Sequence, residues 1–112
     1  MSAEQAFRDC RIDVPASAKV LGYYAWPADD EYPMAAVLRM PCSAVSRFVS
    51  GSGLGKASSH DEAIASVQVF ARSHGWSADA KDDRYLRTGD GGEVLSVLVH
   101  RTGTECTAYL DN

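Results

Sequence analysis

The sequence predicts an α+β fold with one antiparallel sheet of about five strands and two helices packed on one face. Segments rich in β-branched and aromatic residues, separated by two segments with helical spacing, give the element order β-β-α-α-β-β-β. Strands and helices do not alternate in this order, as they would in a parallel sheet. The apolar residues of the last three strands share one face, which suits a sheet that helices cover.

Length and composition indicate a single domain over residues 1–112. Residues 1–17 are predicted to form an extended N-terminal arm, in which residues 4–9 favour a short helix. Apolar residues make up 46% of the chain and charged residues 23%, as in ordinary globular proteins. The formal net charge is −4 and no basic stripe is present, so we expect no nucleic-acid partner. No segment approaches the roughly 20 apolar residues of a membrane-spanning helix, so we expect no membrane span.

The first two strands are predicted over residues 20–26 and 34–40, which are rich in aromatic and aliphatic side chains. A loop over 27–33 separates them, because two prolines and adjacent acids disfavour strand pairing. If Trp26 pairs with Met34, the outer face of this hairpin is unusually apolar. That face then consists of Leu21, Tyr23, Ala25, Ala35, Val37 and Arg39.

Two helices are predicted in the middle of the chain. The first begins after Pro41 and ends at Gly51, with an apolar stripe facing the sheet. Residues 51–59 form a flexible connection, and the S-x-x-E spacing over 59–62 predicts a capping box that starts a second helix over about 60–74. The inward positions are Val45, Phe48 and Val49 in the first helix and Ala63, Ile64, Val67, Phe70 and Ala71 in the second.

The last three strands are predicted over residues 84–88, 93–100 and 104–110, separated by glycine-containing turns. The predicted register pairs His100 with Glu105 and, through a four-residue turn, Leu86 with Leu95. The inward face then consists of Leu86, Leu95, Val97, Val99, Cys106, Ala108 and Leu110.

No motif for catalysis, cofactor binding or metal binding is complete in this sequence. The glycine-rich segment 51–58 fails as a phosphate loop, because Ala57 follows Lys56 where Ser or Thr is needed. The three histidines lack HExxH spacing, and no GxSxG segment presents a serine. The acidic turns lack the alternating ligands of a calcium loop. We therefore expect no catalytic residue, no cofactor and no metal ion.

Aromatic and acidic residues of the first hairpin are the best candidates for a binding surface. One of two adjacent tyrosines in a regular strand must face outward, and rigid aromatic surfaces anchor interfaces at low entropic cost. The acids of the 27–33 loop would suit a basic partner. The candidate binding residues are Tyr23, Asp29, Asp30, Glu31 and Tyr32.

The three cysteines, Cys10, Cys42 and Cys106, allow at most one internal disulfide and leave one thiol over. No CxxC pair is present, so a zinc site is not expected. From the residues alone, one disulfide and three buried thiols are equal alternatives.

The N-terminal half contains a recognisable pattern. In residues 7–18 (FRDCRIDVPASA), a cysteine precedes an apolar-Pro-x-x-Ala segment. The strand that contains Tyr24-Ala-Trp26 follows, and the helix that starts in residues 41–48 leads to Gly53-Leu54. This pattern, over residues 7–55, resembles small uncharacterised actinobacterial exported or lipoprotein-like domains. The resemblance implies export and a disulfide between Cys10 and Cys106, and it implies no activity.

Together, these observations predict a non-enzymatic domain, secreted or located in the cell envelope, that binds another protein or a cell-envelope component. The predicted surface is the outer sheet face or the 27–33 loop. A homodimer contact through this surface and a cytoplasmic location stay open. The competing hypothesis is an inhibitor or immunity-type protein that blocks a basic protein partner, and a small hydrolase-like enzyme is the second alternative.

Overall fold

The fold is defined by a computed structural model that describes residues 2–25, 34–57, 62–73, 75, 82–89 and 94–112. The elements are, in chain order, α1 (Ala3–Asp9), β1 (Lys19–Ala25), β2 (Met34–Pro41), the 3₁₀ turn η1 (Cys42–Ala44), α2 (Val45–Gly51), β3 (Gly55–Lys56), α3 (Glu62–Ser73), β4 (Asp83–Thr88), β5 (Val94–Thr102) and β6 (Glu105–Asp111). Within these described ranges, every helix is too short or too polar to cross a lipid bilayer.

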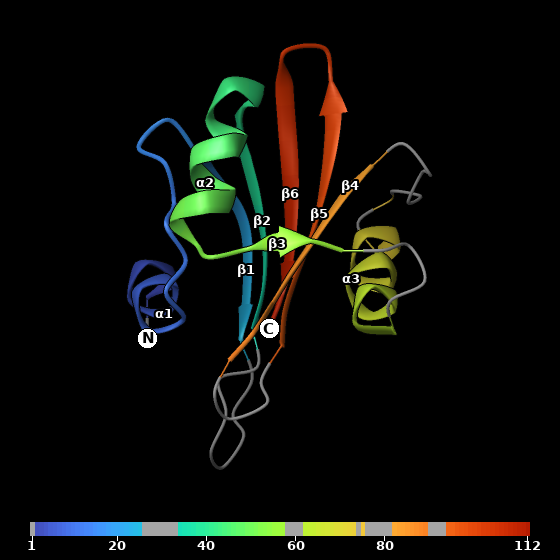
Figure 1. Cartoon of the computed structure of the whole chain (residues 1–112). Helices are drawn as coiled ribbons and strands as arrows, with labels where there is room; N and C mark the ends of the chain where they lie inside the picture. Colours follow the sequence, from blue (N-terminus) through green and yellow to red (C-terminus); the bar gives the residue numbers. More distant parts are fainter. Residues whose placement is uncertain (1, 26–33, 58–61, 74, 76–81, 90–93) are drawn as a thin grey trace.

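The six strands form one sheet in the order β1-β2-β6-β5-β4-β3, and every neighbouring pair is antiparallel (Figure 1). The predicted antiparallel α+β architecture is confirmed. The additional strand is β3, where the sequence predicts only a flexible connection. Its two residues pair with Tyr85 and Leu86 of β4, and two residues are too few to show an alternating pattern in the sequence.

The helices lie on opposite faces of the sheet, so the prediction that both cover one face is wrong (Figure 1). Phe48 of α2 packs on one face together with α1, whereas Val67 and Ala71 of α3 pack on the other. The chain changes face because β3 joins the edge of the sheet between the two helices. Consistent with two covered faces, five successive residues of β5, 95–99, are buried.

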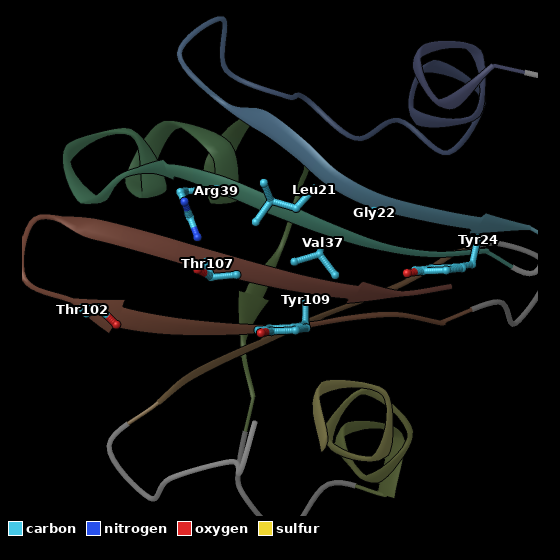
Figure 2. A pocket seen from close by; sticks show the side chains of 8 residues that line it. All are labelled: Leu21, Gly22, Tyr24, Val37, Arg39, Thr102, Thr107 and Tyr109. Atoms are coloured by element: carbon cyan, nitrogen blue, oxygen red, sulfur yellow. The ribbon is translucent and has the colours of Figure 1, made fainter. Parts of the chain in front are cut away.

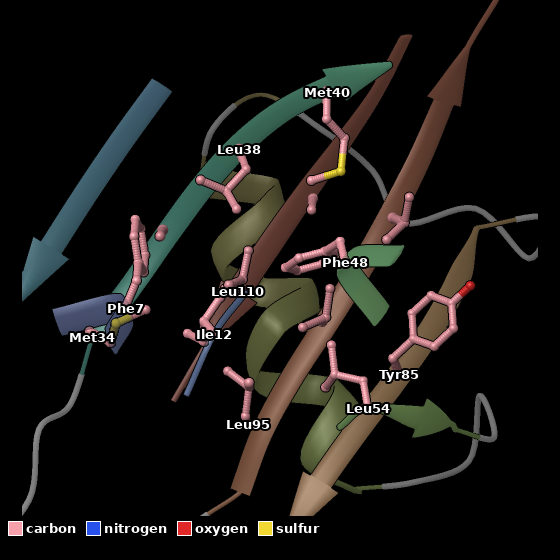
Figure 3. Packing of buried hydrophobic residues seen from close by; sticks show 14 of the residues in the cluster. Phe7, Ile12, Met34, Leu38, Met40, Phe48, Leu54, Tyr85, Leu95 and Leu110 are labelled. Carbon is pink, nitrogen blue, oxygen red and sulfur yellow. The ribbon is translucent and has the colours of Figure 1, made fainter. Parts of the chain in front are cut away.

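The larger core fills the space between the sheet and the layer of α1 and α2 (Figure 3). Phe48 is fully buried there, and Val45 and Val49 pack beside it as the predicted stripe requires. The N-terminal arm is part of this core, since α1 contributes Phe7 and the segment after it contributes Ile12. We call this face the α1 side.

The smaller core lies between α3 and the opposite face, which we call the α3 side. Val67 and Ala71 are buried and Phe70 is half-buried, which confirms the inward prediction for these three positions. The side chains of Ala63 and Ile64, and the capping residue Ser59, lie outside the described residues. The sheet contributes Val37, Leu86, Leu98 and Tyr109 to this core.

The pairing of β5 with β6 is shifted by two residues from the predicted register. Glu105 lies opposite Thr102, and His100 lies opposite Thr107. Because side chains alternate between faces, a shift of two residues leaves the predicted inward face of both strands unchanged. Val97, Val99, Ala108 and Leu110 are accordingly buried on the α1 side.

The pairing of β4 with β5 is shifted by one residue, and this reverses the faces of β4. Thr88 pairs with Val94, so the connection is one residue longer than the predicted four-residue turn. An odd shift turns each side chain to the other face. Tyr85 therefore enters the α1-side core, and Leu86, predicted there, packs on the α3 side.

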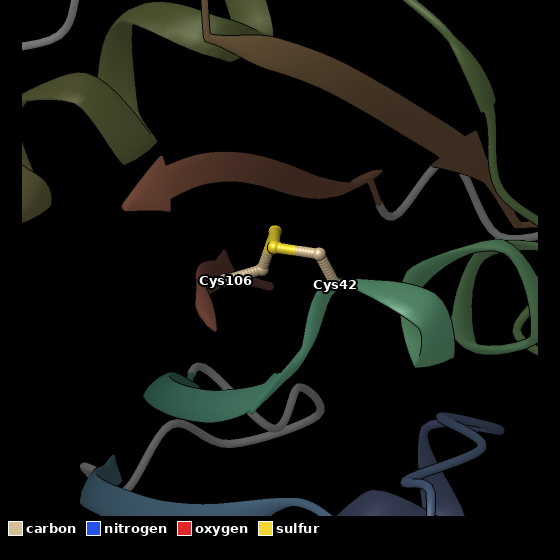
Figure 4. The surroundings of a disulfide bond; sticks show 2 residues. All are labelled: Cys42 and Cys106. Carbon is tan, nitrogen blue, oxygen red and sulfur yellow. A yellow bond between two sulfur atoms is a disulfide. The ribbon is translucent and has the colours of Figure 1, made fainter. Parts of the chain in front are cut away.

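The disulfide joins Cys42 to Cys106, so the pairing of Cys10 with Cys106 is wrong (Figure 4). Cys42 directly follows β2, and Cys106 lies opposite Met40 in the β2–β6 register. This places the two Cα atoms 4.9 Å apart, within the range that a disulfide spans. Cys10 is a free, half-buried thiol at the end of α1, and its Sγ accepts a hydrogen bond from Asn112 Nδ2 at 3.6 Å.

Arg87 of β4 holds the end of α1 against the end of α2. Its guanidinium donates hydrogen bonds to the backbone carbonyls of Cys10, of Arg11 at 3.0 Å and of Ser52 at 2.7 Å. Ser52 Oγ also accepts a hydrogen bond from the Asp13 amide at 2.9 Å. Helix ends leave carbonyls without intrahelical partners, and a guanidinium can satisfy several of them.

The cysteine assignment predicts one titratable thiol in denatured, unreduced protein and three after reduction, measured by thiol counting. Reduction should destabilise the fold by about 2–5 kcal/mol, because it removes the constraint on the unfolded chain. Cys10→Ser should leave no thiol before reduction. Three thiols before reduction, or a crosslinked peptide containing Cys10, would contradict the assignment.

The environment of Cys10 predicts slow alkylation in the native state. Burial raises the pKa of the Cys10 thiol, with Arg87 opposing this shift and Asp9 adding to it. Since the thiolate is the reactive form, iodoacetamide should modify native protein more slowly than denatured protein, and the native rate should rise at higher pH than the denatured rate. Equal pH profiles in the two states would contradict this environment.

The Arg87 contacts predict that Arg87→Met lowers the free energy of unfolding by about 1–3 kcal/mol, because three backbone carbonyls lose their donor while the aliphatic stem is largely kept. Urea denaturation measures the effect. Arg101→Met, at an exposed position of β5, is the matched control and should change stability by less than about 0.5 kcal/mol. Equal losses in both variants would show that the guanidinium contacts are not the cause.

Candidate functional site

A hollow of about 390 Å³ lies on the α3 side of the sheet (Figure 2). The strands β1, β2 and β6 and the end of β5 provide its lining. The hollow exists because α3 packs on β5 and β6 and leaves the β1–β2 part of this face open. Its lining residues are Leu21, Gly22, Tyr24, Val37, Arg39, Thr102, Thr107 and Tyr109.

A β-bulge in β1 decides which residues of this strand reach the hollow. Val20 pairs with Leu38 and Gly22 pairs with Val37, so Leu21 is the extra residue. On the loop side of the bulge, Ala25, not Trp26, pairs with Met34, so the register there differs by one residue from the predicted one. At the bulge itself, two residues of β1 lie opposite one residue of β2. Val20 and Leu21 are therefore both largely exposed, at 44% and 49%.

The same shift exchanges the two tyrosines of β1. Tyr23, predicted to face outward as a binding residue, packs instead against Phe7 on the α1 side, with ring centroids 6.1 Å apart. Tyr24 takes its place at the hollow and is 47% exposed. The prediction of an outward tyrosine is confirmed, but the residue named for it is wrong.

A row of aromatic rings connects the hollow to α3. Phe70 lies between Tyr24 and Tyr109, with edge-to-face contacts at centroid distances of 6.0 Å to each. Such contacts add about 0.5–1.5 kcal/mol per pair beyond the burial of area. Phe70 of α3 therefore supports Tyr24 and Tyr109, which line the hollow, and connects them to the smaller core.

A row of polar residues crosses the sheet at the other end of the hollow. The register places Lys19 opposite Arg39, Arg39 opposite Thr107, and Thr107 opposite His100. Directly paired residues share a face, so all four positions belong to the α3 side. Arg39 and Thr107 line the hollow itself.

Asp82 ends this polar row as the partner of His100. Its Oδ1 lies 2.8 Å from His100 Nδ1, and the Asp82 side chain is only 4% exposed against 27% for His100. The predicted pairing of His100 with Glu105 is therefore wrong. A buried carboxylate needs such a partner, because desolvation of an isolated charge is costly.

The hydroxyl of Tyr109 is influenced by charges of opposite sign. Burial raises the pKa of Tyr109, the positive charge of Arg39 opposes the shift, and the negative charge of Asp82 adds to it. The phenol therefore stays protonated at neutral pH and can donate a hydrogen bond. Arg39 is therefore close enough to Tyr109 to influence its hydroxyl electrostatically.

The other predicted binding residues, Asp29, Asp30, Glu31 and Tyr32, lie outside the described residues. Arg39, Thr107 and Tyr109 were not predicted as site residues. Thr107 and Tyr109 of β6 lie on the same face of the sheet as His100 of β5, and the alternation of side chains in the sequence indicates this. Their closeness to β1 depends on the β2–β6 pairing. In the parts of the chain that the structure covers, no three His, Cys, Asp or Glu side chains gather as a metal site.

Comparisons of the chain with protein-family models, with curated proteins and with solved structures found no match.

The Asp82–His100 pair predicts that His100→Phe lowers the free energy of unfolding by about 1–3 kcal/mol, since the buried carboxylate loses a hydrogen-bond partner. Urea denaturation at neutral pH measures the loss. Thr102→Val, on the same face of the same strand but exposed, is the control and should change stability by less than about 0.5 kcal/mol. If both substitutions have the same small effect, the pair contributes little to the fold.

Proposed function

We propose that this protein is a non-enzymatic, exported binding domain whose ligand or partner occupies the hollow on the α3 side. The observation that carries the proposal is the exposure of Leu21 and Tyr24, 49% and 47%, at the rim of a hollow that α3 leaves open. Exposed large apolar side chains that gather at a concave surface are typical of binding sites.

The size and chemistry of the hollow support binding of a ligand. Its volume of about 390 Å³ is in the range of small-molecule sites, and its lining combines apolar side chains with polar groups that could orient a ligand. The walls rest on a rigid base, because Val37 and Tyr109 are buried members of the smaller core. A rigid base lowers the entropic cost of binding.

Export is part of the proposal. A disulfide forms and persists in oxidising compartments, and the Cys42–Cys106 bond fits that environment. The bond joins Cys42, directly after β2, to Cys106 of β6, and both of these strands line the hollow. In an oxidising compartment the disulfide would therefore stabilise the binding surface directly.

The two competing functions have weaker support. An inhibitor of a basic protein would use the acids Asp29, Asp30 and Glu31, whereas the charged residue that lines the hollow is a cation, Arg39. A hydrolase would use the Asp82–His100 pair, since a carboxylate orients histidine in many hydrolases. Such a pair also has a plain structural role, which is to satisfy a buried carboxylate.

A fragment screen tests the proposed site. Small organic fragments should shift the backbone amide signals of residues that line the hollow, chiefly Gly22, Val37 and Tyr109, in NMR spectra of isotope-labelled protein. Leu21→Ala should weaken the best fragments about threefold or more, because their apolar contact is lost.

The matched control is Val20→Ala. Val20 is exposed to a similar extent, 44%, but pairs with Leu38 and belongs to the other face. It should leave fragment affinity unchanged. Fragments that shift only signals away from the hollow, or that respond equally to both substitutions, would contradict the proposed function.

A further inference from the structure

We propose that the hollow binds a carboxylate attached to an apolar or aromatic body, with the carboxylate held at the Arg39 end. This inference rests on the proposed function and adds the chemical class of the ligand. It follows from the charges at one end of the hollow and from the separation of polar and apolar residues along it.

Two cations face each other across β1 and β2. Lys19 lies directly opposite Arg39 in the register, and both are exposed. Like charges at directly opposed positions repel each other and destabilise the strand pair. An anion bound between them would remove this repulsion, and a carboxylate suits a guanidinium because it accepts two parallel hydrogen bonds.

The acid nearest to this end in the register does not neutralise Arg39. Glu105 lies two residues before Thr107 on β6 and is therefore a diagonal neighbour of Arg39 on the same face. Among the described residues, neither Arg39 nor Lys19 forms an ion pair with it or with any other acid. The Arg39 end of the hollow is therefore positively charged, although the formal net charge of the chain is −4.

Polar and apolar residues separate along the strands that form the floor. Arg39 and Thr107 form one cross-strand row, and Val37 and Tyr109 form the next row on the same face. The two rows are about 7 Å apart, since two strand residues span that distance. In Figure 2, Arg39 and Thr107 lie toward one end, Val37 and Tyr109 lie in the middle, and Tyr24 lies toward the other end.

This layout specifies how the ligand would lie. Its carboxylate would accept hydrogen bonds from Arg39 and from the hydroxyl of Thr107, while its apolar body would contact Leu21, Val37 and the aromatic row that begins at Tyr24.

Titration with phenylbutyrate and with its neutral amide, phenylbutyramide, tests the inference by amide NMR on the full chain. Phenylbutyrate should shift the signals of residues lining the hollow and should bind about fivefold more tightly than the amide, because only the acid carries the charge that Arg39 recognises. The difference should shrink as salt is raised.

Matched variants locate the charge that is recognised. Arg39→Gln should weaken phenylbutyrate about fivefold and leave phenylbutyramide unchanged. Arg101→Gln makes the same change of charge on the α1 side, since Arg101 lies opposite Cys106, and should have no such effect. Glu105→Gln should strengthen phenylbutyrate binding, because it removes an acid that is a diagonal neighbour of Arg39 on the same face.

The outcomes separate this inference from the proposed function. If acid and amide bind the hollow equally, or if Arg39→Gln and Arg101→Gln weaken the acid equally, the carboxylate inference is overturned while the hollow remains a binding site. If phenylbutyrate leaves the signals of the hollow unchanged while other, uncharged fragments shift them, the inference alone fails. If no fragment of any charge shifts them, both proposals fail.

Discussion

The pairing of β2 with β6 is the contact on which the rest of the structure depends. It joins the N-terminal hairpin to the three C-terminal strands over seven residue pairs, from Ala35 opposite Asp111 to Pro41 opposite Glu105. The Cys42–Cys106 disulfide closes one end of this pairing. Because the partners are distant in sequence, the pairing carries a large loop-closure entropy, and the disulfide removes part of that cost from folding.

This pairing also creates the candidate site. It brings Arg39 beside Thr107 and Val37 beside Tyr109, so residues from two separate parts of the chain form one floor. The change of face at β3 then places α3 on that side, where its Phe70 supports the aromatic wall. All the residues that line the hollow belong to strands, and α3 contacts two of them, Tyr24 and Tyr109, through Phe70. The hollow is therefore a consequence of the position of α3 as much as of the strands.

Sequence reasoning predicted the elements well where side chains alternate or recur regularly. The stripe at Phe48, the inward positions Val67 and Ala71 and the last three strands follow from such periodicity. It failed where a difference of one residue decides which face a side chain occupies. Ala25 instead of Trp26 pairs with Met34, which exchanged the faces of Tyr23 and Tyr24, and the longer connection before Val94 reversed the faces of β4. It also missed β3, whose pairing depends on a strand thirty residues away and leaves no local pattern.

Aromatic NOE spectroscopy tests the central claim most directly, because the β1 register and the opposite placement of the helices both determine which rings touch. We expect cross-peaks from the Tyr24 ring to Phe70, from Phe70 to Tyr109, and from the Tyr23 ring to Phe7. Cross-peaks from Tyr23 to Phe70 and from Tyr24 to Phe7 would contradict it. That result would restore the register in which Trp26 pairs with Met34 and would remove Tyr24 from the hollow.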